Sequence, residues 1–189
     1  MTAITALVES DCDFSRAMFR RARVEASRAR RFATKAGERR DVSSEMERHC
    51  VASAVTLAAV AAQDWVTWAL LSTRLPIPSV DKRQRHSSLE RWRRLPQVAW
   101  SLGRAHDFGL SETQESFLED LGAWHGALSY ADPRAQARLL QQLVSGGFID
   151  GRQNETHVIR AELAIATVTS VGRLFSWAHS VTGLPTPVN

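Results

Sequence analysis

Apolar positions along the chain recur at helical spacing, and no stretch alternates for long enough to predict a strand. Residues from about Ile4 to Ala36 contain neither proline nor glycine, and after Arg20 charged positions are as frequent as apolar ones. This pattern predicts a long, exposed, basic first helix that ends near Gly37.

The next helix is predicted to be the buried centre of the fold. Ser44 is followed three residues later by Glu47, the spacing of a capping box in which each side chain satisfies a backbone N–H at the helix entrance. From Cys50 to Leu71 the segment is apolar nearly all round, as in a helix with no solvent-exposed face. Within it, Trp65 and Trp68 stand one helical turn apart and share a face.

Further helices follow from the same start and stop signals. Two more capping-box spacings mark starts, and an Asp-Pro pair marks another. The chain also places glycine or proline where helices should end. The predicted helices run from Ser87 to about Leu102, from Ser111 through Trp124, from Asp132 to Gly146, and from near Thr156 to about Val181.

These elements predict one all-α domain spanning 1–189, built as an antiparallel bundle of four main helices plus shorter ones. Residues 1–40 form its long basic helix, 42–74 its central buried helix and 87–181 the rest of the bundle. At this length the chain buries enough surface to need no disulfide or metal. The apolar stripes predict a core of Val55, Trp65, Trp68, Trp92, Phe117, Leu121, Leu174 and Phe175.

Composition points to a cytoplasmic protein without a membrane span. Cys12 and Cys50 have neither metal-binding nor redox spacing, and no hydrophobic secretory leader precedes them, so we expect reduced thiols. The longest apolar stretch, Val51 to Ala62, is too short to cross ~30 Å of hydrocarbon.

The net charge of +4 is concentrated near the start of the chain. Between Arg16 and Arg48 there are eleven basic and five acidic residues. Such a surplus fits either a solvated helix face or a surface for nucleic acid or an acidic partner. The candidate binding residues are Arg20, Arg21, Arg28 and Arg31.

The chain lacks the sequence motifs of common catalytic frameworks. It has no glycine-rich phosphate loop, paired-histidine metal motif or nucleophile elbow, and no glutamate with histidine at i+3, so no metal or cofactor is predicted. Asp64 interrupts the buried helix and His125 follows Trp124 on an apolar helix. Structural roles are favoured for both residues, and lining a small-molecule pocket is the alternative.

The segment from Ser87 to Pro133 carries an ordered series of motifs. It contains Ser88-Leu89, a basic-Trp pair at Arg91-Trp92 and then Leu95-Pro96, followed by a loop and an apolar helix. In this order the motifs resemble bacterial HEPN-like helical proteins. The resemblance implies a helical fold and a homodimer. In active relatives an Arg-Asn-x-x-x-His motif from each of two subunits acts on the 2′-hydroxyl and phosphate of RNA.

This chain departs from the family at that motif. His125 stands at the place of the arginine, Gly126 at that of the asparagine and Tyr130 at that of the histidine. Tyrosine, with a pKa of ~10, is a poor general base near neutral pH. A second Arg-x4-His spacing runs from Arg152 to His157, at the entrance of the last helix.

The leading hypothesis is therefore a non-catalytic HEPN-like module that self-associates or binds RNA or a protein partner in a defence or toxin-type system. The dimer contact is expected around Trp124 to Tyr130. One alternative is a metal-independent ribonuclease that cleaves RNA through Arg152 and His157. The other is a small-molecule enzyme whose helical-bundle pocket is lined by Asp64, His125 and tryptophans.

Overall fold

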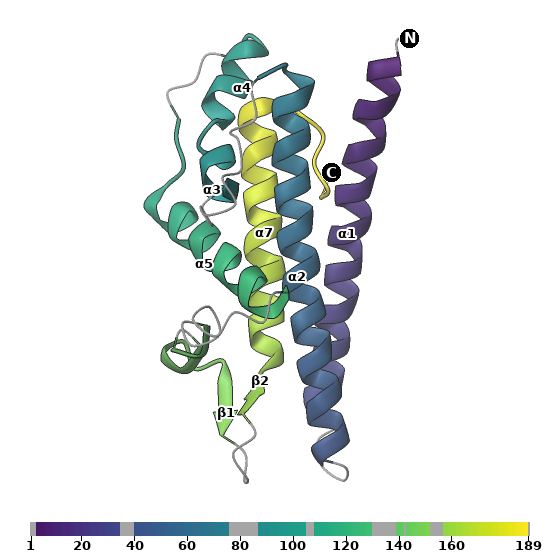
Figure 1. Ribbon diagram of the computed structural model, residues 1–189, viewed down its shortest axis with the longest axis vertical. Coiled ribbons are helices and arrows are strands. Elements are labelled where there is room, and N and C mark those ends of the chain that lie inside the picture. The colour runs from purple at the N-terminus through teal and green to yellow at the C-terminus, as the bar shows by residue number, and fades with distance from the viewer. Residues whose placement is uncertain are drawn as a thin grey trace.

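The computed structural model describes residues 3–34, 40–75, 87–104, 108–129, 139–141, 143–151 and 157–188. Helices dominate this part of the chain (Figure 1), as the apolar periodicity predicted. The helices are α1 (Ala3–Thr34), α2 (Arg40–Ser72), α3 (Ser87–Trp92), α4 (Leu95–Ser101), α5 (Glu112–Ser129) and α7 (Ala161–Thr182), and the strands are β1 (Ile149–Gly151) and β2 (His157–Ile159).

Three long helices, α1, α2 and α7, lie side by side, and α5 runs obliquely across α7 to α2 (Figure 1). α1 and α2 form an antiparallel pair, but α2 and α7 run in the same direction. Glu47 near the start of α2 contacts Ala161 at the start of α7, and Trp65 further along α2 contacts Pro185 just beyond the end of α7. The expected antiparallel arrangement therefore does not extend to α7, because the intervening chain returns to the end where α2 begins.

The capping boxes have different outcomes. At the start of α5, the Ser111 N–H donates to Gln114 Oε1 at 2.8 Å, and the Gln114 N–H donates to Ser111 Oγ at 3.2 Å, which confirms that prediction. α2, by contrast, begins at Arg40, four residues before Ser44. Glu47 instead turns inward, and its Oε1 accepts the N–H of Ala161 at 2.9 Å. Glu47 of α2 thus caps the first turn of α7, whose own N-cap residue makes no side-chain hydrogen bond.

The helix predicted from Ser87 to Leu102 is broken into α3 and α4 at Arg93 and Arg94. Pro96 is the cause, because it has no N–H to donate to the carbonyl of Trp92 and its ring would clash there in a continuous helix. The backbone tightens at the break: the Arg94 N–H donates to Arg91, and the Gln97 N–H to Arg94. Pro96 is then tolerated in the first turn of α4.

The last helix begins at Ala161, later than the expected start near Thr156, because a short hairpin precedes it. β1 pairs antiparallel with β2, with Ile149 opposite Ile159. The prediction of a chain without strands was wrong here. Each strand has only three residues, too few to produce a visible alternation of apolar and polar positions.

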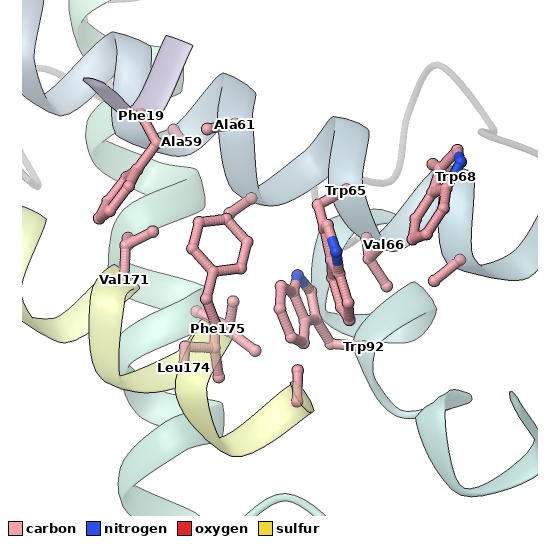
Figure 2. Close-up of a cluster of buried hydrophobic side chains, with 14 of the residues drawn as sticks. Phe19, Ala59, Ala61, Trp65, Val66, Trp68, Trp92, Val171, Leu174 and Phe175 are labelled. Atoms are coloured by element: carbon pink, nitrogen blue, oxygen red, sulfur yellow. The ribbon is translucent and has the colours of Figure 1, made fainter. Parts of the chain in front are cut away.

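The upper part of the core is an aromatic cluster of Phe19, Trp65, Trp68, Trp92 and Phe175 (Figure 2). The rings of Trp65 and Trp92 stack with centroids 5.4 Å apart, and Trp65 and Phe175 pack edge to face with centroids 5.8 Å apart. Four helices, α1, α2, α3 and α7, thus meet through aromatic rings, which bury large apolar areas.

A second cluster fills the lower half of the fold, where α2, α5 and α7 approach one another. Its buried members include Val55, Trp124 and Leu163. Phe117 is only partly buried and packs against both clusters, whereas all the other residues predicted for the core are buried. These are Val55, Trp65, Trp68, Trp92, Leu121, Leu174 and Phe175.

After α7 the chain turns at Gly183, whose φ of 69° is the left-handed conformation that favours glycine at a helix end. The following residues run back between α1 and α2 (Figure 1). The carbonyl of Pro185 accepts the indole N–H of Trp65 at 2.9 Å and lies 3.7 Å from the Cys12 thiol, which donates to it. Thr186 and its neighbour Pro187 are buried, so this segment packs onto the helices after α7 ends.

Helix α2 has the length and composition that a membrane-crossing helix needs, over Ser43–Ser72. Buried positions make up 61% of its apolar window, and the core helix of a soluble protein meets the same criteria. The finding is therefore weak evidence for a span, and burial against α1 and α7 accounts for the apolar character of α2.

Candidate functional site

Helix α1 presents two kinds of arginine to solvent. Arg21 and Arg28 both pair with Glu25, at 3.0 and 3.2 Å, and Arg16 pairs with Asp13 at 3.0 Å. Four others are exposed and have no ion pair with any residue in the described part of the chain. We call these four the arginine row: Arg20, Arg23, Arg30 and Arg31.

The spacing of the arginine row places it along one side of α1. Its members are separated by three, seven and one residues, which at 100° per residue keeps them within about a third of the helix circumference. From Arg20 to Arg31 the row extends ~16 Å along the helix axis, at 1.5 Å per residue. In Figure 1, α1 stands at the edge of the molecule, so a large ligand can approach its outer side.

The row faces outward because the opposite side of α1 is small and apolar. Ala22, Ala26 and Ala29 are buried at helical spacing, and Phe19 inserts its ring beside Phe175 with centroids 5.3 Å apart. Small side chains let α1 lie close against its neighbours. Helix α1 is thereby fixed in rotation, and the arginine row is held on its solvent side.

Glu25 distinguishes the two kinds of arginine, because Arg21 and Arg28 pair with it and the members of the arginine row do not. Its side chain is buried, although it lies between the exposed Arg21 and Arg28. Burial raises the pKa of the neighbouring Cys50 thiol, and a hydrogen bond to Glu25 raises it further. Cys50 therefore stays protonated at neutral pH and is a poor nucleophile. Burial also raises the pKa of Cys12.

The proposed pocket residues belong to different parts of the fold. Asp64 lies on α2 next to Trp65 of the aromatic cluster, whereas His125 lies on α5 next to Trp124 of the lower cluster. Trp124 belongs to the same cluster as Val55, which is nine residues, or ~13 Å of helix, before Asp64. The tryptophans next to the two side chains, Trp65 and Trp124, are thus buried in separate clusters.

His125 is half-buried, and burial lowers the pKa of its imidazole below the ordinary value of 6.5. The ring is therefore neutral at pH 7 and carries no positive charge that could stand in for a guanidinium. Tyr130 and Arg152 lie outside the described residues. Of His157 the structure describes only the backbone, at the first position of β2.

The expected dimer contact around Trp124 is largely used within the chain. Trp124 and Ala127 are buried in the lower cluster, and Leu128 packs against it. These three residues therefore contribute to the core, and the described part of the segment leaves little apolar surface for a second subunit.

Two of the four arginines predicted for binding, Arg20 and Arg31, belong to the arginine row. Arg23 and Arg30 were missed, although the sequence contains the signal that selects them. No acidic residue stands three or four positions from any member of the row, whereas Glu25 has that spacing to Arg21 and Arg28.

Among the described residues, no group of three or more histidine, cysteine, aspartate or glutamate side chains is arranged to hold a metal ion. The arginine row is thus the feature with the clearest chemistry, namely unneutralised guanidinium groups on a rigid helix. No family model, curated protein or solved structure matches the chain.

Proposed function

We propose that the protein is a non-catalytic helical module, HEPN-like in its motifs, that binds RNA through the arginine row of α1. One observation carries the proposal: four exposed guanidinium groups share one side of a helix and have no acidic partner among the described residues. A cationic surface of this kind attracts a polyanion.

Guanidinium groups suit phosphate because their planar fork donates two hydrogen bonds to one phosphate group. Each contact also releases counterions condensed on the nucleic acid, which gives an affinity that falls as salt rises. Arg21 and Arg28 are less suited to this role, since a phosphate would have to compete with the carboxylate of Glu25.

The non-catalytic part of the proposal is supported by the groups that could move a proton. His125 is neutral at pH 7 and half-buried, and at the motif it replaces an arginine. The thiols of Cys12 and Cys50 are held protonated by burial. RNA cleavage by general acid–base chemistry needs a positioned group that titrates near neutral pH together with a cation for the phosphate.

The binding proposal predicts different results for two matched double variants. Replacing Arg20 and Arg31 by alanine should reduce the slope of log affinity against log salt by about two, roughly one per lost phosphate contact. Replacing Arg21 and Arg28 removes the same charge from the same helix but should change the slope by less than half as much. Fluorescence anisotropy with labelled tRNA at several salt concentrations measures both, and thermal melting checks that each variant is folded. Equal losses in the two variants would contradict the assignment to the arginine row.

Binding and cleavage are tested separately. Wild-type protein and the Arg152→Ala, His157→Ala double variant are incubated with labelled tRNA and mRNA, and we expect both to leave the RNA intact. Cleavage by the wild type that is lost in the double variant would overturn the non-catalytic assignment. It would support a ribonuclease that uses these two residues instead.

Homodimerisation is part of the same proposal and follows from the HEPN resemblance and from the prevalence of symmetric pairs among oligomers. Because Trp124 and Ala127 are buried in the lower cluster, the contact has to use other residues. Sedimentation velocity at micromolar concentration is expected to give twice the 21.0 kDa mass of the chain. A single 21.0 kDa species at tens of micromolar would contradict the dimer.

A further inference from the structure

We infer that the RNA held by the arginine row is double-stranded, with α1 lying across a groove so that the two ends of the row contact opposite strands. The inference rests on the proposed RNA binding and specifies its substrate class. It follows from how the row is divided, from the side chains that accompany it and from the charge density of the ligand.

The arginine row consists of two pairs rather than an even series. Arg20 and Arg23 form one pair and Arg30 and Arg31 the other, with centres ~13 Å apart along the helix at 1.5 Å per residue. That separation has the scale of a nucleic-acid groove, ~12 Å for the wide groove of B-form DNA. Double-stranded RNA is recognised largely through phosphate and 2′-hydroxyl contacts across its wide, shallow minor groove. A straight helix with cations at two places fits this arrangement.

Between the two pairs, the arginine row is interrupted by short side chains, and the long exposed side chain of Arg28 beside them is paired with Glu25 at 3.2 Å. Ser27 and Val24 are both exposed there. They leave room for the groove to come close to the helix while the longer arginines reach the backbones on either side.

The described part of this side also lacks the aromatic residues typical of single-strand sites, which add stacking of bases on aromatic rings to their positive charge. Phe19 is buried against Phe175. Phe14 is exposed but lies ~120° around the helix from Arg20, at 100° per residue. The arginine row can therefore bind phosphates, but it offers no aromatic ring on which an unpaired base could stack.

Charge density favours a duplex for such a phosphate-only site. Each contact contributes ~0.9 to the salt slope on a B-form duplex and ~0.7 on a single strand, because the duplex carries more condensed counterions. Four contacts then give a slope of about −3.6 against about −2.8, and an affinity advantage for the duplex that is largest at low salt.

The test compares a blunt RNA duplex of mixed sequence, one of its strands alone and a second duplex of unrelated sequence, all titrated with the full chain at several salt concentrations. We expect the two duplexes to bind with equal affinity and more tightly than the strand at low salt. The slope difference of about 0.8 should widen this advantage by about sixfold for each tenfold fall in salt. Equal or tighter binding of the strand would overturn the duplex inference and leave the proposed RNA binding intact. Failure of all three RNAs to bind would overturn the proposed function itself.

The position of α1 across the groove is tested by Ser27→Arg, which adds a cation between the two pairs. On the duplex this arginine lies over the open groove, so the salt slope should stay unchanged. On the single strand, which can follow the helix, the slope should steepen by ~0.7. A steepening of ~0.9 on the duplex would contradict the two-strand arrangement.

Discussion

Replacing Trp65 by alanine is expected to lower the free energy of unfolding by about 3–5 kcal/mol. Trp65 is fully buried, stacks on Trp92 and packs against the edge of Phe175. Truncation leaves a cavity between three helices that rigid neighbours fill poorly. It also removes the donor to the carbonyl of Pro185. Urea denaturation followed by circular dichroism measures the change.

Trp100→Ala is the matched control, since it removes the same side chain from α4 where 73% of the residue is exposed. Its effect should stay within about 0.5 kcal/mol, as for ordinary surface substitutions. Similar losses in the two variants would contradict the assignment of Trp65 to the centre of the core.

Replacing Glu47 by alanine is expected to cost about 1.5–3 kcal/mol, the range for hydrogen bonds to charged groups. The side chain is buried, and its Oε1 holds the N–H of Ala161, which has no partner inside its own helix. Removing the carboxylate leaves that N–H buried and releases the start of α7 from α2. Denaturant unfolding gives the total change, and hydrogen exchange at Ala161 reports the local loss directly.

Glu45→Ala provides the comparison for this substitution. Glu45 lies two residues earlier on α2, with its side chain 62% exposed and 3.7 Å from His49. Exposed pairs of this kind contribute little, so a change below about 0.5 kcal/mol is expected. Equal losses of unfolding free energy in Glu45→Ala and Glu47→Ala would show that the missing cap on α7 is not the reason for the loss in Glu47→Ala.

Much of the fold could be predicted from apolar periodicity, because burial selects side chains every three or four residues along a helix. The capping box at Ser111 was also readable, since its two hydrogen bonds are local. The parallel course of α2 and α7 was not readable, because it depends on where a long connection brings the chain back. The true role of Glu47 was hidden for the same reason: its partner lies 114 residues away.

The candidate site was predicted only in part. The concentration of arginine on α1 was visible as composition, and Arg20 and Arg31 were correctly chosen as exposed cations. Composition alone does not separate these from Arg21 and Arg28, whose charge is shared with a carboxylate buried by the packing of α1 on α2. Asp64 and His125 lie on α2 and α5, next to residues of different apolar clusters, and sequence does not give the level along α2 at which α5 packs.

Synthesis of the chain imposes an order on folding that follows from residues 183–187. The partners of the Pro185 carbonyl, Trp65 and Cys12, precede it by 120 and 173 residues. Helices α1 and α2 can pair early, since contacts between neighbouring segments form fastest. The indole of Trp65, however, stays without its acceptor until Pro185 leaves the ribosome. A released chain that ends at Thr182 retains α7 but lacks this acceptor, and it should therefore be more sensitive to protease around the aromatic cluster than the full chain.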